Sequence, residues 1–435
     1  MALSRTLSGH RTVPASGRLF LSLLERIQVG HLVLITPDAQ PRVFGDPHAA
    51  PGARLELRDW RACGAILRKG DIGFADAWRS FWVDTPDLAA LLRVAIRNER
   101  ALQRTVYGGW LAQLWYGLRH KLRPNTRSGS RRNIHAHYDI GNAFYAQWLD
   151  STFTYSSAVF DGNFYQSLED AQHAKYQRII DTLGLRAGMR ILEIGCGWGG
   201  FAMHAARQGI HVHGITISPA QLEFAAKRVN EAGLNERVHL ELRDYRTLTG
   251  QYDGVVSIEM FEAVGEKFWP TYFRILRERL RPGARALVQT ITIDDSHFAA
   301  YRATSDFIRE FIFPGGMLPS PRRFVEAARR GKLAAHTSLA FGRDYAETLR
   351  RWRSEFEAQL ETIRAQGFDE IFVRTWRLYL AYCEAGFDEG RTDVMQFVLA
   401  PADSPQALAW DDAVRARVTR TENLRMPERL RHETR

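Results

Sequence analysis

The sequence is poor in cysteine and has no long apolar run. Its three cysteines, Cys63, Cys196 and Cys383, lie far apart among 435 residues. Zinc sites and disulfide frameworks need cysteines at short or repeated spacings, so we predict no metal site and expect a reducing compartment. No apolar run approaches the roughly 20 residues that a membrane-spanning helix needs. The short run 20–24 ends at Glu25, which argues against a signal-peptide core. We expect a cytoplasmic protein, at most peripheral on the inner face of a membrane.

Acidic residues are outnumbered by basic ones. Lysine and arginine number 59 and aspartate and glutamate 49, which gives a formal net charge of +10. This balance suits an anionic partner such as nucleic acid, an acidic metabolite or a phospholipid surface. Because the excess is mostly arginine scattered along the chain, a solvated basic surface explains it equally well. The composition, with 45% hydrophobic residues, is that of a globular protein.

Glycines alternate with other residues where a predicted strand becomes a helix. The apolar run 189–194 predicts a buried parallel strand, and 201–207 opens a helix. Glycine is needed where backbone turns sharply or must touch a ligand. The pattern E-x-G-x-G-x-G is neither the dinucleotide fingerprint nor a P-loop. It suits S-adenosylmethionine (SAM), whose amino-acid part a strand-end carboxylate would hold, although an ordinary strand–turn–helix corner is the alternative. The candidate cofactor-binding residues here are Glu193, Gly195, Cys196, Gly197 and Gly199.

Strands alternate with helices from residue 189 onward. The predicted strands cover 189–195, 212–217, 238–243, 252–258 and 285–293, with helices at 200–208, 219–233 and 266–280. Such alternation implies right-handed crossovers and a doubly wound parallel α/β sheet. Two later strands, 335–341 and 394–399, would complete it as an antiparallel pair. Ligands of such sheets bind beyond the carboxyl ends of the strands, so residues just past each strand are the candidates.

Polar residues follow the second and third of these strands. Ser218 can cap the next helix with Gln221 closing a capping box, and Gln221 could equally reach a ribose hydroxyl. Asp244 could accept a hydrogen bond from an adenine amino group, or lie in a solvated turn. The candidate cofactor-binding residues at these two strand ends are Thr216, Ser218, Gln221, Asp244 and Tyr245.

Two carboxylates, Glu259 and Glu262, follow the fourth strand. Burying a carboxylate without partners is costly, so at least one of them should face a polar site. The phenylalanine-rich segment 301–319 could form a lid or an apolar channel wall over the strand ends.

The chain divides into four parts by composition and periodicity. Residues 15–115 predict a small α+β domain, 116–135 a basic linker, 136–400 the α/β domain and 401–435 a charged, frayed tail. The linker could be a solvated hinge, or it could seat phosphate head groups.

Several motifs together resemble one known family. They are His137-Tyr-Asp-Ile-Gly-Asn142, Tyr155-Ser-Ser-Ala158, Met260-Phe-Glu-Ala-Val-Gly265 and Ile312-Phe-Pro-Gly-Gly316, beside the glycine pattern. With them the chain resembles the cyclopropane-fatty-acyl-phospholipid synthase family of SAM-dependent methyltransferases. The resemblance implies a class I methyltransferase with a seven-stranded sheet and a small lipid-associated N-terminal domain. It also implies an unsaturated phospholipid at a membrane surface as substrate, no nucleic acid, and a homodimer.

The resemblance further implies a mechanism. The double bond of an acyl chain attacks the methyl group of SAM, and a bound bicarbonate ion takes a proton so that a cyclopropane ring closes. Glu262 would orient the bicarbonate, while Tyr345 and the backbone N–H of Ile291 would hydrogen-bond it. Ser157 and Gln289 stand where many members have cysteine and histidine, and both could still donate. Tyr155 and Ser156 are assigned to the cofactor site.

Other activities remain open. Because the base decides how the cation loses its proton, a methylene or methyl branch could form instead of a ring. A SAM methyltransferase of a small O or N nucleophile, and a catalytically impaired SAM- or membrane-binding protein, are further alternatives.

Overall fold

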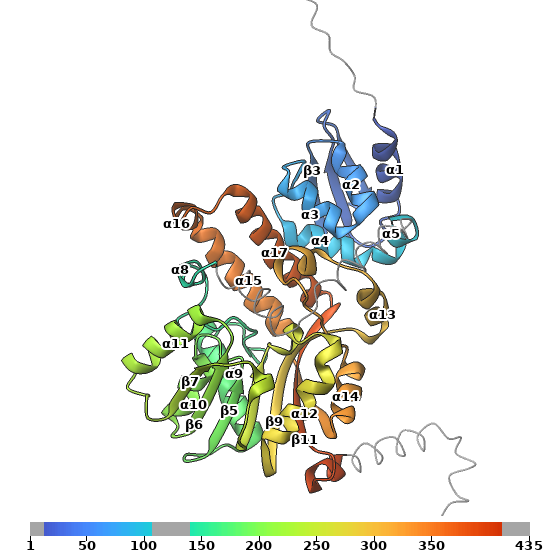
Figure 1. Ribbon diagram of the computed structural model, residues 1–435. Helices are drawn as coiled ribbons and strands as arrows, with labels where there is room; N and C mark the ends of the chain where they lie inside the picture. The colour runs from blue at the N-terminus through green and yellow to red at the C-terminus, as the bar shows by residue number, and fades with distance from the viewer. Residues whose placement is uncertain (1–12, 107–139, 411–435) are drawn as a thin grey trace, which may run out of the picture. The chain divides into compact units, whose positions relative to one another are not determined.

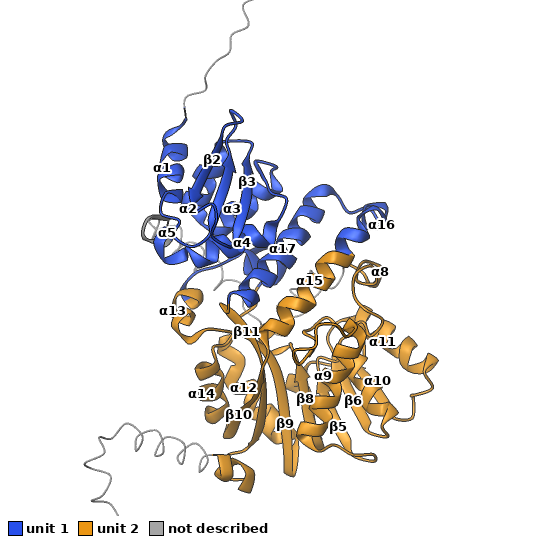
Figure 2. Cartoon of the chain, turned by 180° about the vertical axis from the view of Figure 1, so that it is seen from behind, with its two compact units in different colours: residues 1–122, 303–314, 356–389 blue, residues 123–302, 315–355, 390–435 orange. Residues whose placement is uncertain are grey.

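The computed structural model describes residues 13–106 and 140–410 (Figure 1). The predicted basic linker, His137, Tyr138 and the segment 411–435 lie outside these residues. The chain forms two compact units (Figure 2). The first contains residues 1–122, 303–314 and 356–389, and the second contains 123–302, 315–355 and 390–435.

The N-terminal part of the first unit is a four-stranded sheet covered by helices. Its strands, in the order β2-β1-β3-β4, are β2 (Pro41–Gly45), β1 (His31–Ile35), β3 (Gly52–Leu57) and β4 (Val83–Asp84). The helices are α1 (Ala15–Leu24), α2 (Arg61–Lys69), α3 (Asp71–Arg79), α4 (Leu88–Arg97) and α5 (Glu99–Val106). This part combines helices and strands, as the α+β prediction expects. Gly73 of α3 packs so closely on α2 that a Cβ would lie 2.1 Å from the Ala65 carbonyl oxygen.

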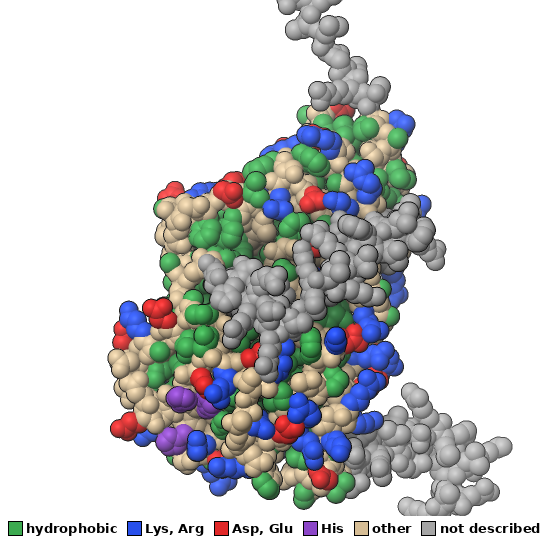
Figure 3. Space-filling view, viewed as in Figure 1, with side chains coloured by type: hydrophobic (Ala, Val, Ile, Leu, Met, Phe, Trp, Pro, Cys, Tyr) green, Lys and Arg blue, Asp and Glu red, His purple; other side chains and the backbone are tan. Residues whose placement is uncertain are grey.

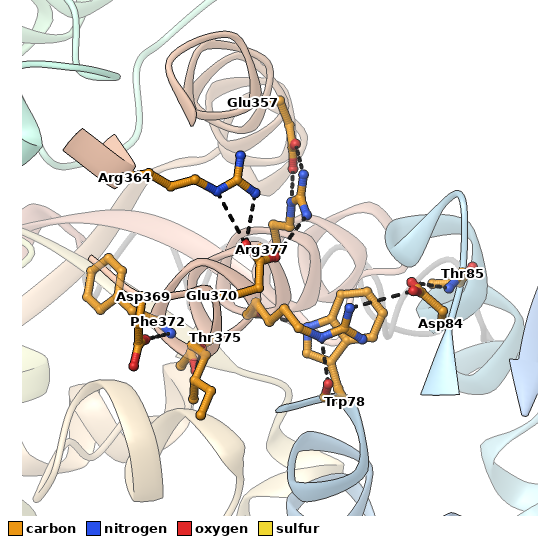
Figure 4. Close-up of polar contacts among 12 residues, drawn as sticks. Trp78, Asp84, Thr85, Glu357, Arg364, Asp369, Glu370, Phe372, Thr375 and Arg377 are labelled. Atoms are coloured by element: carbon orange, nitrogen blue, oxygen red, sulfur yellow. Dashed lines mark hydrogen bonds and ion pairs between the residues drawn. The ribbon is translucent and has the colours of Figure 1, made fainter. Parts of the chain in front are cut away.

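Two later segments belong to the same unit. One carries the π-helix η4 (Ile308–Ile312), and the other carries α16 (Leu360–Ala365) and α17 (Glu370–Asp388). Arg374 of α17 is buried, donates to the Trp78 carbonyl oxygen at 2.6 Å, and lies 3.7 Å from the Trp78 ring centroid. The Arg374 contacts attach α17 to the N-terminal part of the unit. Figure 4 shows the neighbouring pair in which Arg377 donates to the Glu357 carboxylate at 2.7 and 2.5 Å.

The second unit is built on a seven-stranded sheet. Its order is β10-β11-β9-β8-β5-β6-β7, and β5 to β9 run parallel while β10 and β11 are antiparallel. The strands are β5 (Arg190–Ile194), β6 (His211–Thr216), β7 (Val238–Leu242), β8 (Tyr252–Ile258), β9 (Leu280–Ile293), β10 (Leu333–Ala340) and β11 (Thr392–Pro401). The predicted doubly wound sheet with an antiparallel pair is confirmed.

Helices cover both faces of this sheet (Figure 1). Side chains of β5 alternate between two cores: Ile191 packs with α9 and α10, and Leu192 packs with α12 and α14. This alternation follows from the two-residue period of a strand. The helices of this unit are α8 (Asn142–Tyr145), α9 (Leu168–Leu183), α10 (Gly200–Arg207), α11 (Pro219–Glu231), α12 (Trp269–Arg279), α13 (Asp295–Ala303), α14 (Pro321–Arg330) and α15 (Gly342–Ala358), of which α13 and α15 run into segments of the first unit.

Two features near the C-terminus stand out. The helical segment is interrupted, because Gln359 leaves helical geometry between α15 and α16. The tail was expected to be frayed from Pro401, yet its described residues pack: the Trp410 ring stacks on His336 with centroids 5.5 Å apart. Among the described helices, none combines the length and the apolar character needed to cross a membrane.

Candidate functional site

The glycine turn between β5 and α10 has the backbone that the sequence predicts. Gly195, Gly197 and Gly199 have φ angles of 86°, 51° and 83°, a region that favours glycine. A Cβ on Gly195 would lie 2.9 Å from Met260, whereas one on Gly197 would meet no atom within 4 Å. The turn therefore leaves open space beside the half-buried backbone of Gly197, where a ligand can approach. Cys196 is buried, which raises the pKa of its thiol well above the usual value, so its contribution to a ligand is through the backbone.

Glu193 ends the strand below this turn. Its side chain is buried, and its Oε2 atom has no hydrogen-bond partner within the described part of the chain. Burial raises the pKa of Glu193 to about 8, against the opposing effect of the Lys175 ammonium group. A buried carboxylate oxygen that lacks a donor fits the ammonium group of an amino acid. Glu193 and the glycine turn therefore fit the amino-acid part of SAM.

Thr216, Ser218 and Gln221 lie together where β6 ends. The hydroxyl of Ser218 accepts the backbone N–H of Gln221 at 3.3 Å, which confirms the predicted N-cap. The second half of the predicted capping box is wrong: the Gln221 Oε1 atom accepts the Thr216 hydroxyl at 3.1 Å instead. The Ser218 N–H donates to the Thr216 hydroxyl oxygen at 3.2 Å, because Thr216 occupies the place that a capping glutamine would take.

Asp244 and Tyr245 follow β7 at the same edge of the sheet. Arg246 donates to the Asp244 carboxylate from its backbone N–H at 2.9 Å and from its guanidinium group at 2.8 and 2.6 Å. The sequence analysis missed this partner of Asp244, for which a hydrogen bond from adenine and a solvated turn were both left open. Tyr245 packs edge-on against Tyr272 with ring centroids 5.5 Å apart, and burial raises its pKa to about 12.

Glu259 is the centre of the polar site beyond β8. Its Oε1 atom accepts the backbone N–H of Ser157 at 2.9 Å and the Gln289 amide at 2.7 Å, and its Oε2 atom accepts the Tyr345 hydroxyl at 2.7 Å. These three donors are the ones that the family resemblance assigned to a bicarbonate ion. Glu259 also has a φ of 49°, an uncommon backbone for a residue other than glycine that costs about 1–3 kcal/mol and recurs at functional sites.

A chain of side chains orients the Gln289 amide. Gln396 of β11 donates to the Gln289 Oε1 atom at 3.0 Å, and Arg178 of α9 donates to the Gln396 Oε1 atom at 3.2 Å. The amide nitrogen of Gln289 is therefore directed at Glu259. The sequence analysis missed both supporting residues, since each belongs to an element far from the site in sequence.

Glu262 lies beside Glu259 in a different environment. Its Oε1 atom accepts the backbone N–H of Ile291 and the Thr290 hydroxyl, the latter at 2.9 Å. Its Oε2 atom is buried and has no partner among the described residues. Burial, followed by repulsion from Glu259, raises the pKa of Glu262 to about 8. The donors that were expected to share one anion thus divide between two carboxylates here, and the roles of Ile291 and Tyr345 toward a bicarbonate ion stay predictions.

Tyr155 and Ser156 adjoin these carboxylates. The Tyr155 ring lies 5.5 Å from Tyr145, 5.5 Å from Trp148 and 5.4 Å from Trp352, measured between centroids. Ser156 is buried, and its hydroxyl accepts a hydrogen bond from the Lys175 ammonium group. An aromatic wall with electron-rich faces suits a site for a cationic sulfonium group.

One group of potential metal ligands occurs in the described residues, away from this site. His213, His239 and Glu241 offer ligand atoms within 4.8 Å of one another. The two His213 nitrogens already pair with the Tyr252 hydroxyl at 2.7 Å and with Glu241 at 3.1 Å. These internal contacts account for the group without an ion, and the absence of a metal stays a prediction.

The sheet order, the glycine turn and the buried carboxylate at the end of β5 define a class I SAM-dependent methyltransferase. Residues 125–397 match the family model described as mycolic acid cyclopropane synthetase, and the chain belongs to this family.

Relatives agree with this assignment. A tuberculostearic acid methyltransferase of Mycobacterium tuberculosis is 38% identical over 86% of this chain and 88% of its own. The cyclopropane-fatty-acyl-phospholipid synthase of Escherichia coli is 32% identical over 77% of this chain and 84% of its own. A solved mycolic acid cyclopropane synthase in complex with SAH and CTAB has a TM-score of 0.56 and 29% identity, over 62% of this chain and 97% of its own. The protein is therefore a SAM-dependent methyltransferase of a lipid-modifying family.

Proposed function

We propose that the protein methylates the double bond of an unsaturated fatty acyl chain, with the Glu259 carboxylate in the place of a bicarbonate base. The observation that carries this proposal is the convergence of the Ser157 N–H, the Gln289 amide and the Tyr345 hydroxyl on Glu259 at 2.7–2.9 Å. Each of these donors is engaged with Glu259, so a bicarbonate ion would have to displace that carboxylate to accept the same hydrogen bonds. We therefore propose that Glu259 acts without a bound bicarbonate ion.

SAM supplies an electrophilic methyl group on a positively charged sulfur. The π electrons of the double bond would form the new carbon–carbon bond, and the carbon–sulfur pair would stay on sulfur. The positive charge would pass to the second alkene carbon, near the Glu259 carboxylate and the Tyr155 ring. Glu259 would then accept a proton from the added methyl group. Its Oε2 atom receives the Tyr345 hydroxyl bond, which leaves a lone pair for that proton.

The timing of this proton transfer decides the product. If the C–H electrons close onto the neighbouring cationic carbon, a cyclopropane ring forms. If a hydride first shifts from the methylated carbon to the cationic one, loss of the same methyl proton gives a methylene branch. We favour the branched product, because the relative that aligns with 86% of the chain is named a tuberculostearic acid methyltransferase. A saturated methyl branch would need an additional reductant. The cyclopropane ring is the second candidate, on the strength of the synthase from Escherichia coli.

The direct experiment uses purified protein, SAM with a labelled methyl group, and oleoyl-phospholipid vesicles. We expect the label in the acyl chains, with a mass gain of one CH₂, and NMR of the methyl esters separates a ring from a methylene branch. The rate should be the same in bicarbonate-depleted and bicarbonate-supplemented buffer. Label only in water-soluble products would favour a small-molecule methyltransferase instead, and no label anywhere, with no SAM binding, would favour a catalytically impaired protein.

A phospholipid surface is the partner that this proposal requires. Arg322, Arg329 and Arg330 on α14 and Arg274 on α12 are exposed, and Figure 3 shows basic side chains over this part of the second unit. Each basic residue near an anionic surface contributes about 1 kcal/mol. We expect salt-sensitive binding to vesicles that contain anionic lipid, and weaker binding when the three α14 arginines are replaced by glutamine. Equal binding to neutral vesicles would contradict this.

A further inference from the structure

Lys175 is a buried lysine that the proposed reaction does not yet use. It lies on α9, and its side chain is fully buried. Lysine is rarely buried without a partner, because removing an ammonium group from water is costly. Its position beneath both the cofactor site and Glu259 therefore calls for a functional explanation.

Two side chains of α9, Gln172 and Lys175, hold Ser156, which directly precedes the backbone N–H donor to Glu259. Gln172 donates from its amide to the Ser156 carbonyl oxygen at 2.9 Å. Lys175 donates to the Gln172 Oε1 atom at 2.7 Å and to the Ser156 hydroxyl. Ser156 is thus held at its main chain and at its side chain, and the next residue along the chain is Ser157, whose N–H binds Glu259.

Three carboxylates also act on the Lys175 ammonium group. They are Glu259 beyond β8, Asp150 in the loop before the Ser156 turn and Glu193 at the end of β5. The Tyr176 ring on α9 lies 5.0 Å from the Lys175 nitrogen and favours the cation. Burial outweighs these effects and lowers the pKa of Lys175 to about 7, whereas the carboxylates raise it. In return, Lys175 lowers the pKa of Glu259 against the raising effect of burial.

We propose that Lys175 is a positioning residue for the base. Its ammonium group holds the Ser156–Ser157 turn so that the Ser157 N–H meets Glu259, and it favours the ionised form of that carboxylate. This inference rests on the proposed role of Glu259 as the proton acceptor. It predicts a dependence on charge that a merely structural lysine would not have.

The test is the pH dependence of turnover in Lys175→Met. Without the cation the pKa of Glu259 rises, so we expect the acid limb of the kcat profile to move to higher pH by about one unit or more. Turnover at pH 7 should fall about tenfold and recover partly towards pH 9. Lys175→Arg keeps the charge, so its acid limb should lie at the same pH as that of the unchanged protein. A folded Lys175→Met protein that binds SAM and shows an unshifted limb would overturn the charge role.

Ser156→Ala tests the positioning role without removing the lysine, and it serves if Lys175→Met does not fold. We expect a several-fold loss of kcat and a shift of the acid limb to higher pH that is smaller than in Lys175→Met, because the Ser157 N–H also lowers the pKa of Glu259. An unchanged kcat, or a loss confined to SAM affinity, would overturn the positioning role. Glu259→Gln separates the two proposals. Wild-type turnover in that variant would contradict the role of Glu259 as the base. An inactive Glu259→Gln, together with an unshifted acid limb in Lys175→Met, would contradict only the inference on Lys175.

Discussion

The Glu259 carboxylate accepts a 2.7 Å hydrogen bond from the hydroxyl of Tyr345, a residue 86 positions later in the chain. Glu259 follows β8 and Tyr345 lies on α15, so the packing of α15 places a donor on the proposed base. The Asp344 carboxylate, one residue earlier, accepts the Phe160 N–H at 2.7 Å. The same turn of α15 thus supports both Glu259 and the loop that carries Ser157.

Replacing Glu259 by glycine should make the enzyme depend on added bicarbonate. Glycine suits the φ of 49°, and it frees the three donors together with the space of the carboxylate. We expect Glu259→Gly to be nearly inactive in bicarbonate-depleted buffer and to recover activity as bicarbonate is added. Glu259→Gln fills the same space with a neutral amide and should not recover. Equal responses of the two variants to bicarbonate would contradict the proposal that the Glu259 carboxylate fills the place of a bicarbonate ion.

Tyr345→Phe should shift the pH dependence of turnover. The Tyr345 hydroxyl lowers the pKa of Glu259 by hydrogen-bonding its ionised form. Without it the pKa of Glu259 rises, so we expect the acid limb of the kcat profile at higher pH and turnover at pH 7 reduced about tenfold. Tyr252→Phe is the matched control, because that hydroxyl binds His213 rather than a site residue, and its profile should match that of the unchanged protein.

SAM binding should release a proton near pH 7. The pKa of Glu193 is raised to about 8, so most of this carboxyl is protonated at pH 7, and it must ionise to hold an ammonium group. Calorimetry in buffers of different ionisation enthalpy should detect this release, and it should diminish as the pH rises above 8. Glu193→Gln should bind SAM more weakly and release no proton from this site. The control is Asp253→Asn, whose carboxylate is paired with Arg281. Identical proton release in Glu193→Gln and the unchanged protein would contradict the assignment.

Arg374→Met should destabilise the first unit. The buried guanidinium group binds the carbonyl oxygens of Trp78 and Val83 at 2.6 and 2.8 Å, and both would lose a charged donor. We expect a loss of about 3 kcal/mol in the free energy of unfolding, measured by urea denaturation. Arg364 is 45% exposed and pairs with Glu370, so Arg364→Met should cost less than about 1 kcal/mol. Similar losses in the two variants would show that burial of Arg374 is not the cause.

The strand-and-helix alternation made the second unit predictable from the sequence, because buried parallel strands are short, apolar and bounded by glycine. Strand β8 has the predicted bounds, whereas β9 begins five residues before the predicted 285, since its pairing with β8 extends to Leu280. Local pattern could not show this, because strand pairing is a tertiary effect. The N-cap at Ser218 could be predicted because it is a local contact, since Ser218 and Gln221 lie within one helical turn.

The proposed base could not be assigned from the sequence. Glu259 and Glu262 are three residues apart and chemically alike, and the resemblance directed attention to Glu262. Only the structure shows that donors from three distant segments meet at Glu259. Lys175 and Gln396 were missed for a related reason: each reads as an interior position of a helix or strand, and nothing nearby in sequence marks its partner.

The left-handed backbone of Glu259 has an evolutionary consequence. Glycine adopts that positive-φ conformation with the least steric cost. Glycine and glutamate codons can differ by a single base. If Glu259 is the base as proposed, one point mutation at this position exchanges an enzyme that draws on dissolved inorganic carbon for one that carries its own proton acceptor. A lineage that made this change would be free to modify its lipids at the same pace whatever the carbon dioxide supply of its surroundings.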